Sequence, residues 1–104
     1  MALDITHQEM DGFVVIAPAG EVDLYTSPEL RKAILAASKK KTDIKVDLRD
    51  VGYMDSSGVA TLVEGLQGAG KTGKSFVLTQ PSHAVMKVLQ LARLDSVFTI
   101  EEAD

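Results

Sequence analysis

Residues 44–63 carry the clearest structural pattern in the chain, IKVDLRDVGYMDSSGVATLV. Apolar and polar residues alternate over 44–48, which is the period-two pattern of a half-buried strand. A turn is expected at 50–52, and from Val59 onward the apolar residues recur at the spacing of an amphipathic helix. The segment therefore predicts a strand followed by a helix, with the residues DSSG at 55–58 forming the junction.

The N-terminal part of the chain predicts a β-hairpin. Alternating residues at 3–7 indicate a first strand, and the apolar run at 13–17 indicates a second. Asp11-Gly12 between them is a typical two-residue hairpin turn. Pro18 and Gly20 are expected to end the second strand.

Helices and strands then alternate to the end of the chain. Thr26 and Glu29 have the spacing of a capping box, which predicts a helix start. The remaining elements are a helix ended by the glycine-rich stretch 68–73, a strand at 76–78, a helix capped by Ser82 and a strand at 97–100. We expect one α/β domain over residues 1–104, with a mixed sheet of about five strands, an N-terminal hairpin, three to four helices and parallel pairing after the hairpin.

Composition excludes several classes of protein. The chain has no cysteine, so it has no disulfide or thiolate metal site, and its formal net charge of −4 argues against a nucleic-acid partner. No stretch approaches the ~20 apolar residues of a membrane span. The N-terminus has neither the basic nor the apolar region of a signal peptide, so a cytoplasmic location without membrane insertion is expected.

Two stretches, 65–72 and 68–75, match the nucleotide-binding pattern G-x-x-x-x-G-K-[ST]. That loop binds phosphate only between a preceding strand and a following helix, and here a helix precedes and a strand follows. His7 and His83 stand alone, without ligands at metal-binding spacing. No catalytic residue, metal or cofactor is therefore expected, and the protein is predicted not to be an enzyme.

The junction at 55–58 has two local interpretations. Asp55 or Ser56 can accept hydrogen bonds from the first turn of the helix, and Ser56 is the expected cap. Two adjacent serines exceed what one cap requires, and Gly58 is expected to leave the Ser57 hydroxyl sterically open. A helix N-terminus also tolerates a phosphate group, because its N–H groups and dipole favour negative charge.

The sequence around this junction resembles the STAS domain family, in particular the bacterial anti-sigma-factor antagonists. The resemblance rests on VDL at 46–48, DV at 50–51 and YMDSSGV at 53–59, with GEVD at 20–23 ahead of the helix beginning SPELR at 27–31. It extends from about residue 3 to residue 100, and the predicted order of strands and helices agrees with the STAS fold.

The resemblance implies a partner-switching regulator in which Ser57 is the phosphorylated residue. The kinase would be an anti-sigma factor and serine kinase of the histidine-kinase-like ATPase type. The dephosphorylated antagonist would bind this kinase and release its target, and a PP2C-type phosphatase would reset the switch. The residues implied in partner binding are Glu21, Asp23, Asp55, Ser56, Ser57 and Gly58.

Two alternatives stay open. The chain could be a STAS subunit or scaffold of a membrane transport or stress-sensing complex. Asp23 could also be an ordinary turn aspartate with no role toward a partner.

Overall fold

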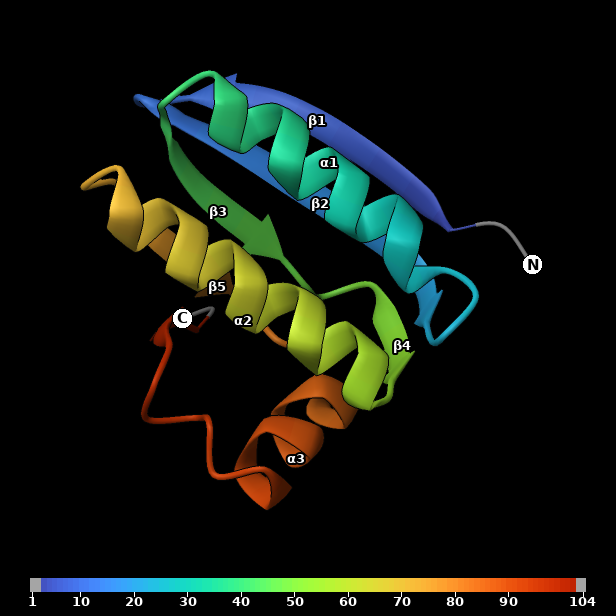
Figure 1. Ribbon diagram of the computed structural model, residues 1–104. Coiled ribbons are helices and arrows are strands. Elements are labelled where there is room, and N and C mark those ends of the chain that lie inside the picture. The colour runs from blue at the N-terminus through green and yellow to red at the C-terminus, as the bar shows by residue number, and fades with distance from the viewer. Residues whose placement is uncertain (1–2, 103–104) are drawn as a thin grey trace.

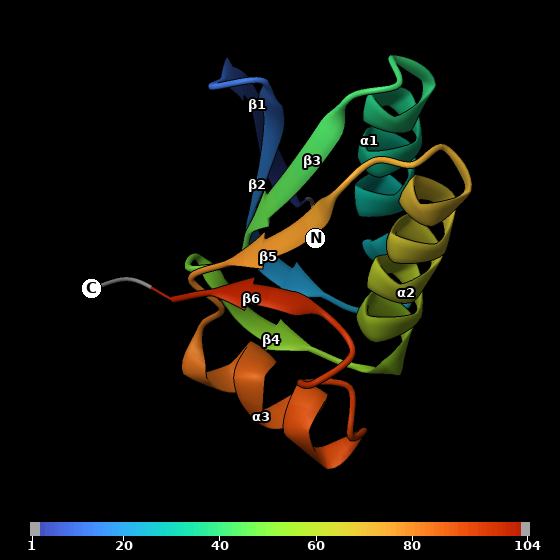
Figure 2. The ribbon, with the colours of Figure 1, turned by 90° about the vertical axis from the view of Figure 1, so that its left-hand side faces the viewer.

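The computed structural model describes residues 3–102, in which a mixed sheet is covered on one face by two helices (Figures 1 and 2). The elements are β1 (Asp4–Met10), β2 (Phe13–Val22), α1 (Ser27–Lys39), β3 (Asp43–Asp47), β4 (Val51–Met54), α2 (Ser56–Lys71), β5 (Phe76–Thr79), α3 (His83–Leu91) and β6 (Thr99–Glu101). Within the described residues the sheet has the order β1-β2-β3-β5-β6, and β4 pairs with β2. Only β1 and β2 are antiparallel, so the expected hairpin and the parallel pairing after it are confirmed.

β2 is longer than the sequence predicted, and Pro18 lies inside it. The parallel pairing of β2 with β3 ends at Ile16, and its pairing with β4 begins at Gly20. Pro18 therefore lies between two partners, where its missing N–H interrupts no parallel ladder. Gly20 has φ +126°, and the register shifts between Gly20 and Glu21, so the strand bends there from one partner to the next.

Residues 51–54 form β4, where the sequence predicted only a turn and a lead into the helix. Val51 and Met54 are buried, and the two residues between them are exposed, so this strand lacks the alternation that identifies a strand in a sequence. Its pairing with the end of β2 makes it a strand.

The core lies between the sheet and the helices α1 and α2, and α3 packs beside β4 (Figure 2). The predicted inward face of α1 is confirmed, because Leu30, Ile34 and Ala37 are buried. Ser82 caps α3 as expected, and its hydroxyl accepts from the N–H of Val85 at 3.3 Å.

The glycine-rich stretch ends α2 and has no phosphate-loop geometry. Gly73 has φ +71°, and its N–H donates to the carbonyl oxygen of Gly70 at 3.3 Å. The Lys74 N–H donates to the carbonyl oxygen of Ala69 at 2.9 Å, which completes a Schellman ending. A phosphate here would meet the carbonyl end of a helix, whose dipole disfavours anions.

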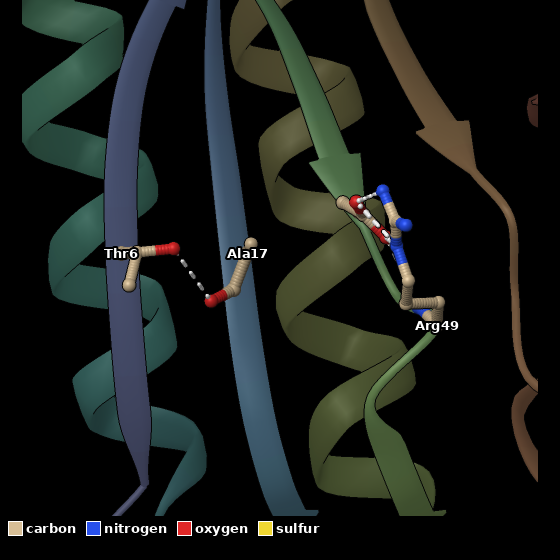
Figure 3. A network of polar contacts seen from close by, with 4 residues as sticks. Thr6, Ala17 and Arg49 are labelled. Carbon is tan, nitrogen blue, oxygen red and sulfur yellow. Dashed lines mark hydrogen bonds and ion pairs between the residues drawn. The ribbon is translucent and has the colours of Figure 1, made fainter.

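The second face of the sheet is covered by no helix in the described chain (Figure 2). Charged side chains pair on it. Lys45 Nζ lies 3.2 Å from Glu101 Oε1. The Arg49 guanidinium donates three hydrogen bonds to the Asp47 carboxylate, at 3.2, 3.0 and 2.7 Å (Figure 3). A hollow of about 300 Å³ lies over this face. These four charged groups are paired with one another, whereas Asp11, which also lines the hollow, has no ion pair among the described residues.

We expect Gly65→Ala to destabilise the protein. A Cβ at this position would lie 2.7 Å from the ring of Phe76 and 3.1 Å from Cγ2 of Ile34. Overpacking of this kind costs roughly 1–3 kcal/mol. Gly70 in the same helix is the matched control, because a Cβ there meets nothing within 4 Å. Gly70→Ala should raise the free energy of unfolding by up to about 1 kcal/mol through helix propensity. Urea unfolding of both variants checks this, and equal shifts would contradict the packing described.

Candidate functional site

The candidate site forms where β2 and β4 end side by side. The two strands are parallel, Val22 pairs with Met54, and the Asp55 N–H donates to the Val22 carbonyl oxygen at 3.2 Å. The residues that follow these strands are Asp23 and Asp55. The turn from β2 into α1 and the first turn of α2 therefore lie at the same edge of the sheet (Figure 1).

Asp55 is the N-cap of α2, and Ser56 is not. The Asp55 carboxylate accepts from the Ser57 N–H at 2.9 Å, and its carbonyl oxygen accepts from the N–H groups of Gly58 and Val59 at 3.1 and 3.2 Å. Ser56 is exposed and its side chain makes no hydrogen bond among those of the described residues. The prediction that Ser56 caps the helix is therefore wrong, because a residue in the extended conformation one position earlier already fills that role.

Ser57 is the second residue of α2 and is half-buried. This agrees with the expectation that it stands at the start of the second helix and is not enclosed in the core.

Gly58 is buried against the ends of both strands. A Cβ there would lie 2.6 Å from Cγ of Met54 and 2.8 Å from Cγ1 of Val22. The glycine is thus required by the close packing of α2 on β2 and β4, and not by the openness of the neighbouring serine that the sequence suggested.

Asp23 organises the turn between β2 and α1. Its Oδ1 accepts from the N–H groups of Tyr25 and Thr26 at 2.9 and 3.0 Å. The Thr26 hydroxyl donates to the Glu21 carbonyl oxygen at 2.7 Å and accepts from the Asp23 N–H at 2.9 Å. The predicted capping box at Thr26 and Glu29 is therefore wrong, since the threonine hydroxyl turns back to the turn and makes no cap bond with the helix.

The hydrogen bonds of this turn also set the ionisation of Asp23. The Thr26 N–H donates to the carboxylate and lowers the pKa of Asp23 below its ordinary value, against a smaller effect of desolvation, and the Tyr25 N–H adds to the lowering. The carboxylate is therefore ionised at neutral pH.

Three large apolar side chains at this edge were missed in the sequence. Leu24 and Tyr25 of the turn are 67% and 83% exposed, and Tyr53 of β4, which pairs with the exposed Glu21, is 48% exposed. The available signal was the pair Leu24-Tyr25 itself, which lies outside every strand or helix period. Large apolar residues in such a turn have no place in the core and indicate a contact surface.

Potential metal ligands are dispersed over the described part of the chain. No three histidine, aspartate or glutamate side chains gather as metal ligands within residues 3–102. His7 lies on β1 and His83 on α3, and no hydrogen bond among the described residues joins either of them to Ser57. None of its helices has the length and hydrophobicity that crossing a bilayer requires.

Comparison with known proteins identifies close counterparts of this architecture. The family model described as "Mlab, STAS domain" matches residues 5–101. The anti-sigma-B factor antagonist of Bacillus subtilis (strain 168) is 29% identical over 98 residues, which cover 94% of this chain and 88% of that protein. An anti-sigma factor antagonist from Mycobacterium paratuberculosis has a TM-score of 0.89 at 25% identity, over 97% of this chain and 86% of that chain. The anti-sigma factor antagonist SpoIIAA in its unphosphorylated form has a TM-score of 0.81 at 24% identity, over 97% and 89% of the two chains.

These relatives are named as antagonists of anti-sigma factors, which are regulatory binding proteins and not enzymes, in agreement with the predicted class. The mixed sheet, its hairpin and its three described helices match the fold that the sequence resemblance implied. The family match over residues 5–101 shows that this chain belongs to the STAS domain family.

Proposed function

We propose that this chain is an anti-sigma-factor antagonist whose binding is switched off by phosphorylation of Ser57. The observation that carries the proposal is the position of Ser57 in the first turn of α2, next to the turn held by Asp23. The partner would be an anti-sigma factor and serine kinase of the histidine-kinase-like ATPase type, with a PP2C-type phosphatase as the resetting enzyme. The switch would operate in the cytoplasm.

The hydrogen bonds of the α2 N-terminus explain why a phosphate would be disruptive there. The N–H groups of Ser57, Gly58 and Val59 already donate to Asp55. A phosphate on Ser57 adds roughly −1.5 to −2 charges two residues from the Asp55 carboxylate and competes with it for the same donor. The helix end therefore accommodates the phosphate less readily than the dipole alone suggests, and the added charge stays on the surface offered to the partner.

Phosphorylation should weaken partner binding by about 100-fold, because an unmatched charge at an interface costs a few kcal/mol and each ~1.4 kcal/mol is tenfold in affinity. Ser57→Ala should bind the kinase permanently and accept no phosphate, and Ser57→Asp should bind weakly. Mass spectrometry after incubation with the kinase and ATP locates the phosphate, and calorimetry measures the binding. Phosphate on Ser56, or tight binding by Ser57→Asp, would refute the assignment of Ser57 as the switch residue.

The two neighbours of Ser57 should differ in their effect on stability. Asp55→Ala removes the cap and should lower the free energy of unfolding by about 1 kcal/mol. Ser56→Ala removes an exposed hydroxyl and should change it by less than about 0.5 kcal/mol, while leaving a protein that the kinase still phosphorylates. Urea unfolding of the unmodified variants measures both, and a larger loss in Ser56→Ala than in Asp55→Ala would contradict the capping geometry.

The alternative, a subunit or scaffold of a membrane transport or stress-sensing complex, predicts a different partner. Affinity capture on the unphosphorylated protein separates the two functions. A histidine-kinase-like ATPase among the captured proteins supports the switch, and a transporter or a large scaffold in its place refutes it.

A further inference from the structure

We propose that Leu24 and Tyr25 are the apolar anchors by which this protein enters a hollow on its kinase partner, and that Asp23 positions them. This inference rests on the proposed function and deepens it. In this inference Asp23 positions the turn, and it does not act by pairing its charge with a group on the partner.

The first observation is the exposure of two consecutive large apolar side chains. Leu24 and Tyr25 are 67% and 83% exposed, although the neighbouring Val22 and Thr26 are buried. Apolar side chains gathered outside the core commonly mark an interaction surface, and tyrosine is among the residues that dominate binding energies. Both side chains belong to the turn that β2–β4 pairing places beside the first turn of α2.

The second observation is that the turn is held in place before any partner arrives. The Asp23 carboxylate accepts from the backbone of Tyr25 and Thr26, and the Thr26 hydroxyl ties the turn to the Glu21 carbonyl oxygen at 2.7 Å. A turn fixed by these bonds loses little conformational freedom on binding, so its exposed side chains contribute more to affinity. Asp23 Oδ1 is thus occupied by the backbone of its own turn.

The negative charge at this edge determines which kind of molecule can bind to Leu24 and Tyr25. Glu21 lies just before the turn and Asp55 follows β4, which pairs with the end of β2, so both add carboxylates to this edge, and the whole chain has a formal net charge of −4. An anionic membrane surface would repel this edge, and a second copy would place the same carboxylates opposite one another. A protein with an apolar hollow and a basic rim fits, and the kinase of the proposed switch is the partner that must approach Ser57 from this side.

The experiment measures binding of the unphosphorylated protein to the purified kinase by calorimetry. Tyr25→Ala and Leu24→Ala should each weaken binding by about tenfold or more, the loss typical of an interface anchor. Met10→Ala is the matched control, because Met10 is 47% exposed beside the β1–β2 turn, at the opposite end of β2 from the Asp23 turn, and its loss should not change the dissociation constant. The KM for phosphorylation of Ser57 should rise in the two anchor variants while kcat stays the same.

A pair of substitutions at Asp23 separates positioning from charge. Asp23→Ala should weaken binding by about tenfold and accelerate amide hydrogen exchange at Tyr25 and Thr26. Asp23→Asn keeps the oxygen acceptor and removes the charge, so it should recover most of the lost binding and the exchange protection. Equal losses of affinity in both variants would show that the partner recognises the charge of Asp23, and the positioning role would be overturned.

The outcomes distinguish this inference from the proposed function. If the wild-type chain binds the kinase and Ser57→Asp does not, while Leu24→Ala and Tyr25→Ala bind as the wild type does, the switch stands and the anchors are refuted. If the wild-type chain binds no such kinase, the proposed function fails and the inference falls with it.

Discussion

The backbone of β4 runs parallel to the last residues of β2, and the Asp55 N–H extends this pairing to the Val22 carbonyl oxygen at 3.2 Å. The candidate site depends on this contact, because it brings together two segments that are far apart in the chain. Parallel strands present their carboxyl ends at the same edge of a sheet, so the residues after both strands become neighbours. Without the pairing, the first turn of α2 and the Asp23 turn would be separate surfaces, and one partner could not contact both at once.

Two glycines make this geometry possible for different reasons. Gly20 has φ +126°, a conformation that other residues rarely adopt, and it lets β2 leave β3 and turn to β4. Gly58 has no such backbone requirement. Because it lacks a Cβ, α2 can approach the strands until the Gly58 Cα lies against the side chains of Met54 and Val22. A side chain at position 58 would push α2 away from the strands and move Ser57 relative to the Asp23 turn. The shape of the surface is therefore set by backbone packing beneath it.

The sequence predicted the elements whose signal is local and periodic, such as the alternating strand at Val46 and the inward face of α1. It did not predict β4, because four residues with two buried ends have no period and become a strand only by pairing with β2. The cap of α2 was ambiguous for a similar reason, since Asp55 and Ser56 are both good caps and only the backbone conformation selects one. The role of Asp23 was also hidden, because its hydrogen-bond partners depend on the fold of the turn.

Two carboxylates at this edge are hydrogen-bonded within the chain, and this bears on how the surface can be recognised. The carboxylates of Asp23 and Asp55 each accept from backbone N–H groups of their own turn, so both are fixed in place. Under the proposal above, these fixed carboxylates would hold the backbone that carries Leu24, Tyr25 and Ser57 in one arrangement before a partner binds. A rigid surface adapts little to a new group, because moving either carboxylate breaks the bonds that shape it. In the proposed switch, a phosphate added at Ser57 therefore could not be accommodated by rearrangement at low cost, and the rigidity that would favour binding of the unmodified surface would also make that surface sensitive to modification.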